Sequence, residues 1–349
     1  MRTVDLRSDT TTLPTDEMRQ AIAESELGDD VFQGDPTVNK LQDLAAQRMG
    51  KEAALLVPSG TMANLASILT HCGRGAEVIL GNRAHTYKYE KGGISAYGGI
   101  HSTQIPNQDD GTMQLEDIGA AIRGIDDHFP VTKLICLENT HNVCGGAPLS
   151  VKYTKEVANL ARAHNIKLHI DGARIFNAAV AQGVEVQELV EDADSISFCM
   201  SKGLAAPVGS VICGSKDFID QARGIRKGLG GGMRQAGIIA AAGIVALETM
   251  VDRLQEDHTN ARILADGIAG LPGVVLDPET IKTNIIYFDL NDAAIESADF
   301  LTVLAAKGIQ FFDTGPRRFR MVTHNDISAE DVLYTIESFK STLTTDSAP

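Results

Sequence analysis

A lysine lies just beyond a predicted buried strand in the segment SFCMSKGLAAP, residues 197–207. The apolar run 195–200 predicts the strand, and Lys202 follows it closely. Ligands of an open α/β sheet bind outside the carboxyl ends of the strands, so an amine there is placed to attack a carbonyl group. A solvated loop lysine is the alternative, and for an isolated lysine it is the commoner one. The residues at neighbouring strand ends must decide between the two.

A carboxylate follows the same pattern in HIDGAR, residues 169–174. Asp171 ends the apolar run 167–171, where it could pair with a protonated pyridine nitrogen. Such an Asp keeps the ring of pyridoxal phosphate (PLP) electron-withdrawing. The alternative is a turn residue, because Asp-Gly is a strong turn pair.

A candidate phosphate site lies in VPSGTMANLAS, residues 57–67. A strand ends there, Ser59, Gly60 and Thr61 form the turn, and an apolar-periodic helix begins. Backbone N–H groups at a helix start bind anions, and small residues let a phosphate approach the backbone. A plain N-cap by Ser59 or Thr61 would have the same sequence.

An imidazole and a phenol follow the predicted strand 77–80 in NRAHTYKYEKGG, residues 82–93. His85 or Tyr87 could stack on a planar cofactor, although a lone histidine here would more often cap a helix. Together the four strand ends supply an amine, a carboxylate, a phosphate cradle and an aromatic ring, which are the parts that a PLP enzyme needs. The fingerprints GxGxxG, GxxxxGK[ST], HExxH and GxSxG are absent from the sequence. A glycine-rich loop, 230–232, is expected to position Arg234 near the phosphate.

The elements that must position these groups alternate along the chain. Apolar runs separated by amphipathic helical segments predict an α/β fold with a mostly parallel sheet between helices. After residue 234 a long helical pattern runs toward residue 262 and is followed by short strands and helices. We therefore predict a large PLP-binding domain over 1–240, a smaller C-terminal α/β domain over 241–343 and a disordered tail at 344–349. The predicted strands are 53–57, 77–80, 133–139, 167–171, 195–200, 210–214, 284–290 and 318–322, and the clearest helices are 61–72 and 153–164.

Composition narrows the class of partner. The 349 residues contain 31 Lys and Arg against 46 Asp and Glu, a net charge of −15. A surface this acidic disfavours nucleic acid and anionic membranes as partners. The five cysteines show no metal-binding spacing, so no metal site is predicted. With no signal peptide or membrane span visible in this sequence, the expected location is cytoplasmic.

The chain resembles the L-threonine aldolases, the low-specificity and L-allo-threonine group of PLP enzymes. Their fold is PLP-dependent transferase fold type I, that of aspartate aminotransferase, which implies a large domain with a mostly parallel seven-stranded sheet. The resemblance extends from residue 5 to 328 and is carried by DLRSDTTT, GDDVFQGDPT, PSGTMAN, HTYKYEKGG, LENTHN, HIDGARIFNA, SKGLAAPVGS and GGGMRQAG. One departure is VCGGAPLS, residues 143–150, where a shorter turn is expected.

The resemblance implies a role for each matched residue. Lys202 would bind the cofactor covalently, Asp171 would pair with the pyridine nitrogen and His85 would stack on the ring. The phosphate would be held by Ser59, Gly60 and Thr61, with Lys227 and Arg234 reaching it across a subunit boundary. Planar guanidinium groups suit carboxylates, and the substrate carboxylate would contact Ser8, Arg174 and Arg320, with Arg174 also beside the cofactor. His128 would lie near the substrate hydroxyl.

The implied activity is cleavage of L-threonine, L-allo-threonine and other β-hydroxy-α-amino acids to glycine and an aldehyde. His85, His128 or an ordered water would take the hydroxyl proton. The implied assembly is a homotetramer, a dimer of dimers with active sites at the dimer interface. The nearest alternatives are a β-eliminating lyase, a racemase or an aminotransferase on the same scaffold. A binding protein that has lost catalysis and a nicotinamide dehydrogenase are more distant, because the lysine, aspartate and histidine are present and the dinucleotide fingerprint is not.

Overall fold

The computed structural model describes residues 3–291 and 295–344 of the chain. Seven strands form the central sheet in the order β2-β8-β7-β6-β5-β3-β4. Their bounds are β2 (Ala53–Val57), β3 (Glu77–Gly81), β4 (His101–Ile105), β5 (Thr132–Glu138), β6 (Lys167–Asp171), β7 (Ser195–Cys199) and β8 (Ser210–Gly214). Only β8 runs antiparallel to its neighbours; all other pairs are parallel. The predicted mostly parallel, seven-stranded sheet is therefore confirmed.

Sequence patterns predicted the central strands of the large sheet well and missed its edge strand β4. The runs 53–57, 167–171 and 210–214 coincide with β2, β6 and β8. The sequence of β4 is HSTQI, and most of it is only partly buried because β4 lies at the edge of the sheet. Without an apolar run, this strand gives no signal of its own.

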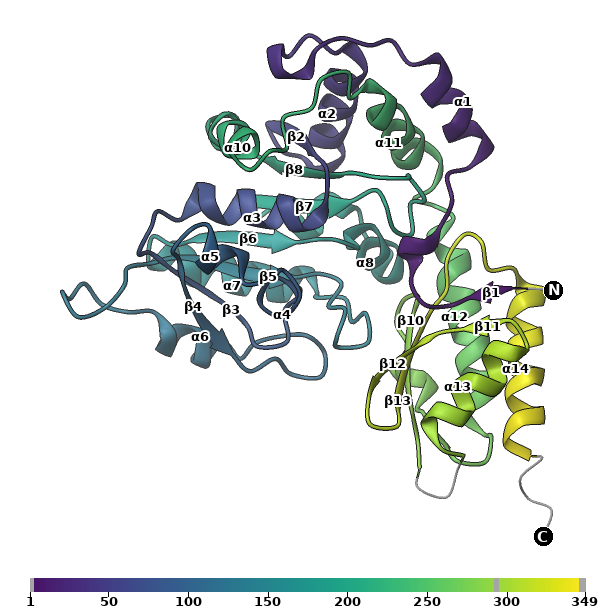
Figure 1. The fold of residues 1–349 in the computed structure, drawn as a ribbon. Coiled ribbons are helices and arrows are strands. Elements are labelled where there is room, and N and C mark those ends of the chain that lie inside the picture. The colour runs from purple at the N-terminus through teal and green to yellow at the C-terminus, as the bar shows by residue number, and fades with distance from the viewer. Residues whose placement is uncertain (1–2, 292–294, 345–349) are drawn as a thin grey trace.

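Helices cover both faces of the large sheet (Figure 1). Alternate residues of β2 show this directly, because Leu55 and Val57 pack in one hydrophobic cluster and Ala54 and Leu56 in another. The first cluster includes side chains of α3 and α10, and the second includes side chains of α2, α8 and α11. The helices of this part are α1 (Asp16–Glu24), α2 (Pro36–Met49), α3 (Gly60–His71), α4 (His85–Lys88), α5 (Gly93–Ala96), α6 (Leu115–Ala121), α7 (Val151–Ala163), α8 (Ile175–Gln182), α9 (Val186–Val190), α10 (Lys216–Gly228) and α11 (Gly237–Thr249).

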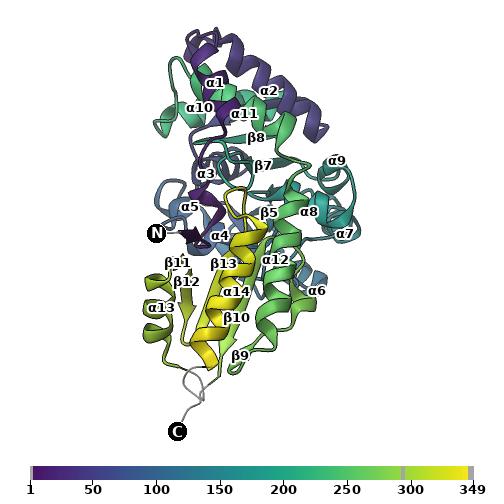
Figure 2. The ribbon, with the colours of Figure 1, turned by 90° about the vertical axis from the view of Figure 1, so that its right-hand side faces the viewer.

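A smaller antiparallel sheet with its own core follows. Its strand order is β12-β13-β10-β9, and α12 and α14 lie side by side against it (Figure 2). Phe288 lies at the centre of that core, with the rings of Phe300, Phe319 and Phe339 between 5.2 and 6.4 Å away. The elements are α12 (Leu254–Ala269), β9 (Val274–Val275), β10 (Ile285–Leu290), α13 (Ser297–Ala306), β12 (Phe312–Gly315), β13 (Arg318–Val322) and α14 (Ala329–Thr344). The N-terminal strand β1 (Val4–Asp5) pairs in parallel with β11 (Ile309–Gln310), which brings the start of the chain to this part.

One helix prediction is wrong. The helical pattern from residue 234 toward residue 262 is divided, because α11 ends at Thr249 and α12 begins at Leu254. The predicted domain boundary at residue 240 falls inside α11, whose buried side chains belong to the large core. The division into domains stays a prediction, and the predicted tail lies, from residue 345 on, outside the described residues. Across the described residues, no helix is long and apolar enough to cross a membrane.

Candidate active site

The carboxyl ends of adjacent strands bring the predicted groups to one edge of the large sheet. Asp171 and Glu138 end β6 and β5 and stand opposite each other in the ladder. Lys202 comes three residues after the end of β7, the other neighbour of β6. Because parallel strands end at the same edge, the amine and both carboxylates belong to one site.

Lys202 lies half-buried in a tight turn. Its carbonyl accepts hydrogen bonds from the Ala205 amide (2.8 Å) and the Thr12 hydroxyl (3.1 Å). The Lys202 charge acts on Asp9, whose carboxyl is fully buried. Burial alone would raise the pKa of Asp9, but Arg174 and then Lys202 hold it well below its usual range. The charge of Lys202 therefore lies close enough to the buried Asp9 carboxylate to act on it.

Hydrogen bonds fix the Asp171 carboxylate at both oxygens. Oδ1 accepts from the amide of Ala173 (3.2 Å) and Oδ2 from Nδ2 of Asn64 (2.7 Å). The same Asn64 nitrogen donates to Oε1 of Glu90 at 2.8 Å. Ligand atoms of His85, Glu90 and Asp171 all lie within 4.8 Å of one another, a set that could also hold a metal ion. Asn64 orders both carboxylates of this set through one nitrogen.

His85 is held in place from two sides. Its backbone N–H donates to Oε2 of Glu138 (2.6 Å), and its Nδ1 lies 2.9 Å from Oε1 of Glu90. Burial would lower the pKa of this imidazole, yet Glu90 and then Asp171 raise it. Because Nδ1 is occupied by Glu90, Nε2 is the ring nitrogen left to act on a ligand.

The amino end of α3 has the geometry of an anion site. Ser59 caps the helix through its hydroxyl, which accepts from the Met62 amide at 3.2 Å. A Cβ on Gly60 would lie 2.8 Å from the Sγ of Cys199, so only glycine fits without displacing that thiol. The first N–H groups of a helix have no partner within the helix. Those of Gly60 and Thr61 are thus available for an anion, so the Ser59 cap does not exclude a phosphate site.

The two arginines predicted to hold a substrate carboxylate differ in their contacts. Arg174 is buried and donates from Nε and Nη2 to both oxygens of Asp9, at 2.6 Å each. Arg320 is more open: Nη1 bonds Oδ1 of Asn142 (3.2 Å) and Nη2 bonds the carbonyl of Arg7 (3.1 Å). One edge of the Arg174 guanidinium is therefore already used inside the protein, and Arg320 is the better placed of the two to meet a ligand.

A cavity of about 870 Å³ opens between the large and small sheets at this edge. His85 and Asn142 line it from the large sheet side, and Arg320 and Tyr287 from β13 and β10. Ser8, the residue before Asp9, is buried, and its hydroxyl accepts a hydrogen bond from the Thr10 amide at 3.2 Å. The loop VCGGAPLS contributes Val143 to this cavity and to an adjoining one of about 550 Å³.

Two predicted residues, His128 and Arg234, lie away from this group within the single chain, and a third, Lys227, lies toward the start of α3. The His128 side chain is 87% exposed in a turn before β5, at the amino edge of the sheet and so opposite the cavity. Arg234 pairs with Asp29 at 2.9 Å and is largely exposed. Lys227, on α10, lies beside Gly232, and the neighbouring Gly231 packs against Met62 near the start of α3.

Sequence reasoning missed several groups that hold the site together. Asn64, Glu90, Glu138 and Asp9 make the hydrogen bonds described above. Glu138 ends an apolar run just as Asp171 does, so the same argument would have found it. The partners of Asn64 lie 26 and 107 residues away along the chain, a relation that spacing does not reveal.

Comparisons with known proteins identify the family and the fold. Residues 5–291 match the family model described as Beta-eliminating lyase. Low-specificity L-threonine aldolase 1 of Arabidopsis thaliana is 50% identical over 353 residues, covering 100% of this chain and 99% of that protein. Among solved structures, a threonine aldolase of Leishmania major has a TM-score of 0.83 at 17% identity, covering 97% of this chain and 98% of that one. An SPT structure with PLP has a TM-score of 0.73 at 18% identity, covering 97% and 87%.

Proposed function

The chain belongs to the beta-eliminating lyase family, as a full-length relative of the low-specificity L-threonine aldolases, and from this premise we propose that it is an aldehyde lyase. It cleaves L-threonine, L-allo-threonine and other β-hydroxy-α-amino acids to glycine and an aldehyde, with PLP as cofactor. The observation that carries this proposal is the meeting of Lys202, Asp171 and the amino end of α3 at one edge of the sheet.

The residues present fit the cofactor. Gly60 lets the start of α3 pack against Cys199, and the first N–H groups of this helix have no partner within it and could bind a phosphate. The Asp171 carboxylate is fixed by two donors yet keeps lone pairs for a ring N–H. When bound, PLP supplies an aldehyde carbon for covalent attachment of an amine and a ring that withdraws electrons from the bond that breaks. Lys202 holds the amine for that attachment.

The protein groups around the cofactor orient the substrate and move its proton. Arg320, with Ser8 and the free edge of Arg174, fixes the substrate carboxylate by charge-assisted hydrogen bonds. His85 would cover the ring of the bound cofactor, and its Nε2 is a candidate to take the hydroxyl proton, with Glu90 beside Nδ1 to balance the charge. His128 or an ordered water are the other candidates.

The activity is tested by product analysis on the purified protein. Incubation with threonine should yield acetaldehyde and glycine; ammonia or a keto acid would instead indicate a β-eliminating lyase or an aminotransferase. Lys202→Ala should abolish the absorbance at about 420 nm that is expected of the lysine-bound cofactor. An unchanged band in Lys202→Ala would contradict the role of Lys202. Lys216→Ala, on a helix away from the site, is the matched control.

We propose a homotetramer with active sites at the dimer interface as the working assembly. Large apolar side chains exposed in the single chain support it, among them Phe32 at 80% and Tyr97 at 69% exposed. His128, at the amino edge of its own sheet, acts on a substrate only if it reaches the site of another copy. Lys227 and Arg234 would likewise reach a phosphate across the boundary.

The five buried, unpaired cysteines support a cytoplasmic location.

Subunit mixing tests this assembly. Light scattering should give four times the chain mass. Lys202→Ala and His128→Ala subunits, each weakly active alone, should regain activity after mixing and exchange, because one mixed site keeps both residues. Activity no higher than the average of the separate variants would refute the sharing of His128.

A further inference from the structure

A line of polar side chains crosses the buried face of the large sheet beneath α3. His71 Nε2 lies 2.7 Å from the Ser195 hydroxyl, which lies 2.8 Å from Nδ1 of His169. Nε2 of His169 then lies 3.4 Å from Oδ1 of Asn64, whose Nδ2 donates to Asp171. This line connects the cofactor edge to the opposite edge of the sheet. Taking the proposed function as given, we propose that His169 and Asn64 are positioning residues for the Asp171 carboxylate.

Strand register places these groups on one face. His169 pairs with Ser195 and Asp171 pairs with Ser197 across β6 and β7. Side chains two residues apart in a strand point to the same face, so the polar residues of LHID and SIS form one buried patch under α3. The Ser197 hydroxyl completes the patch, because it donates to Oδ1 of Asn64 at 2.8 Å.

The orientation of the Asn64 amide follows from its partners. Its nitrogen must face the two carboxylates, Asp171 and Glu90, which only accept hydrogen bonds. Its oxygen therefore accepts from Ser197 and His169. Every hydrogen-bonding capacity of this amide is used, and a flipped amide would turn its oxygen toward two acids. Asn64 is thus fixed only as long as the donors on its oxygen remain.

The same logic fixes the proton positions along the line. Since Asn64 Oδ1 can only accept, His169 carries its proton on Nε2, and its Nδ1 accepts from the Ser195 hydroxyl. Ser195 then accepts from Nε2 of His71. Both imidazoles are neutral in this arrangement, consistent with burial lowering the pKa of His169 to about 3 and that of His71 to about 4. Every donor in the line points toward Asp171.

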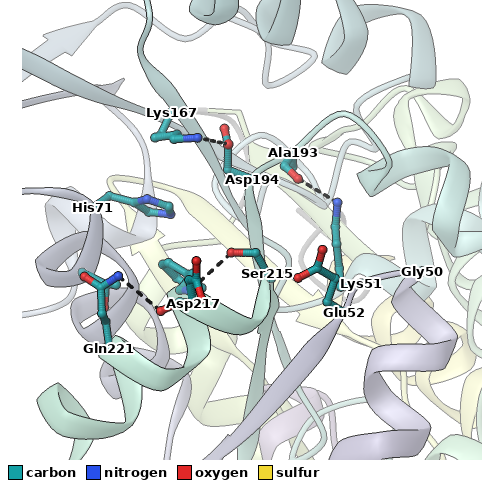
Figure 3. Close-up of a pocket in the computed structure, with 13 residues that line it drawn as sticks. Gly50, Lys51, Glu52, His71, Lys167, Ala193, Asp194, Ser215, Asp217 and Gln221 are labelled. Atoms are coloured by element: carbon teal, nitrogen blue, oxygen red, sulfur yellow. Dashed lines mark hydrogen bonds and ion pairs between the residues drawn. The ribbon is translucent and has the colours of Figure 1, made fainter.

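The far end of the line is anchored at a second cavity, of about 500 Å³ (Figure 3). His71 lines this cavity and stacks on Phe218, with ring centroids 4.5 Å apart and planes 21° from parallel. On the same wall Lys167 bonds Asp194 at 2.7 Å. His71 is therefore held by packing, so that the line ends in a fixed donor and not in mobile solvent.

The chain offers a matched pair of variants at position 169. A Gln side chain can place its amide where Nε2 of His169 lies and still donate to Asn64. An Asn side chain reaches only the position of Nδ1, so it meets Ser195 and not Asn64. Both substitutions replace an imidazole by a neutral amide. Asn is one methylene smaller than Gln, and the free energy of unfolding of each variant measures that packing difference separately from kcat.

The test measures kcat and KM for threonine and the cofactor absorbance of each folded holoenzyme. We expect His169→Asn to lower kcat about 10- to 100-fold at nearly unchanged KM, the range found when outer hydrogen-bond partners of a reactive group are removed. His169→Gln should keep at least about a third of kcat, because the donor is restored. The cofactor band should shift in His169→Asn and not in His169→Gln.

Two more variants complete the design. His71→Phe keeps the stack on Phe218 but removes the donor, and should lower kcat by about two- to tenfold. Gln221→Ala, on the same cavity but outside the line, should leave kcat unchanged. Equal kcat in His169→Asn and His169→Gln would overturn the proposal. Failure of the proposed function is separate, because it would appear in the wild-type protein as no cofactor band or no threonine cleavage.

Discussion

Replacing Asp9 with Asn tests the buried charge pair that underlies the substrate side of the site. Side-chain exposure is 0% for Asp9 and 5% for Arg174, and both hydrogen bonds are 2.6 Å long. The substitution keeps the shape but leaves the Arg174 charge buried without its counter-ion. Removing one partner of such a pair lowers the free energy of unfolding by about 3–5 kcal/mol.

The assay is urea unfolding at fixed protein and cofactor concentration, with Asp192→Asn as the matched control. Asp192 pairs with Arg162 at 2.9 Å on the surface, where an ion pair contributes about 0–1 kcal/mol. Because the pKa of Asp9 is held well below its usual range, the carboxylate stays ionised at neutral and mildly acidic pH. The difference between wild type and Asp9→Asn should thus be constant between about pH 5 and pH 8.

A second readout concerns the substrate. Asp9 orients Arg174, so Asp9→Asn should raise KM for threonine more than it lowers kcat. The reasoning is refuted if Asp9→Asn loses less than about 1 kcal/mol, as the surface control does. It is also refuted if a double-mutant cycle of Asp9→Asn with Arg174→Gln gives strict additivity, because contacting charges must couple.

Three further outcomes follow from the same geometry. Gly60→Ala should weaken PLP binding at least about tenfold in a titration, because the new Cβ would lie 2.8 Å from the Cys199 Sγ. The control is Gly224→Ala, which has open space around it and should stabilise α10 by about 0.5–1 kcal/mol. Arg320→Lys should raise KM for threonine by about tenfold or more with a smaller change in kcat, because the planar fork that meets a carboxylate is lost. Burial lowers the pKa of His169 to about 3, so the folded state keeps it neutral while the unfolded state takes up a proton below about 6.5. Between pH 7.5 and pH 5 the free energy of unfolding should therefore fall by about 2 kcal/mol more in wild type than in His169→Gln.

Local patterns were enough to find the groups at strand ends. Lys202 and Asp171 could be predicted because each directly follows an apolar run, and the edge where parallel strands end is fixed by the fold class. The turn at Ser59–Thr61 could also be predicted, since a strand, small residues and a helix follow one another in the sequence. These predictions need no knowledge of which segments pack together.

Groups that act through distant partners could not be found in this way. Asp9 and Arg174 are 165 residues apart, and the sequence pattern around either residue does not indicate a buried ion pair. The two histidines of the resemblance are a contrasting case. His85 follows its strand and lies at the carboxyl edge, whereas His128 precedes its strand and lies at the other edge. The predicted strands 77–80 and 133–139 already contain this difference, because parallel strands end at the same edge of a sheet.

The two acids near His85, Glu90 and Asp171, share one hydrogen-bond donor and differ in their surroundings. The pKa of Glu90 is raised, first by burial and then by the charge of Asp171, even though His85 and Asn64 counteract the rise. The pKa of His85 is raised as well, so a proton that enters this cluster is held by the hydrogen-bonded pair of His85 and Glu90. Asn64 bridges the two acids through one nitrogen, so the position of one carboxylate depends on the protonation of the other. It follows that the Asp171 carboxylate is positioned through a buried cluster of side chains, so a substitution of Asn64 in α3 should change the position of that carboxylate at the end of β6.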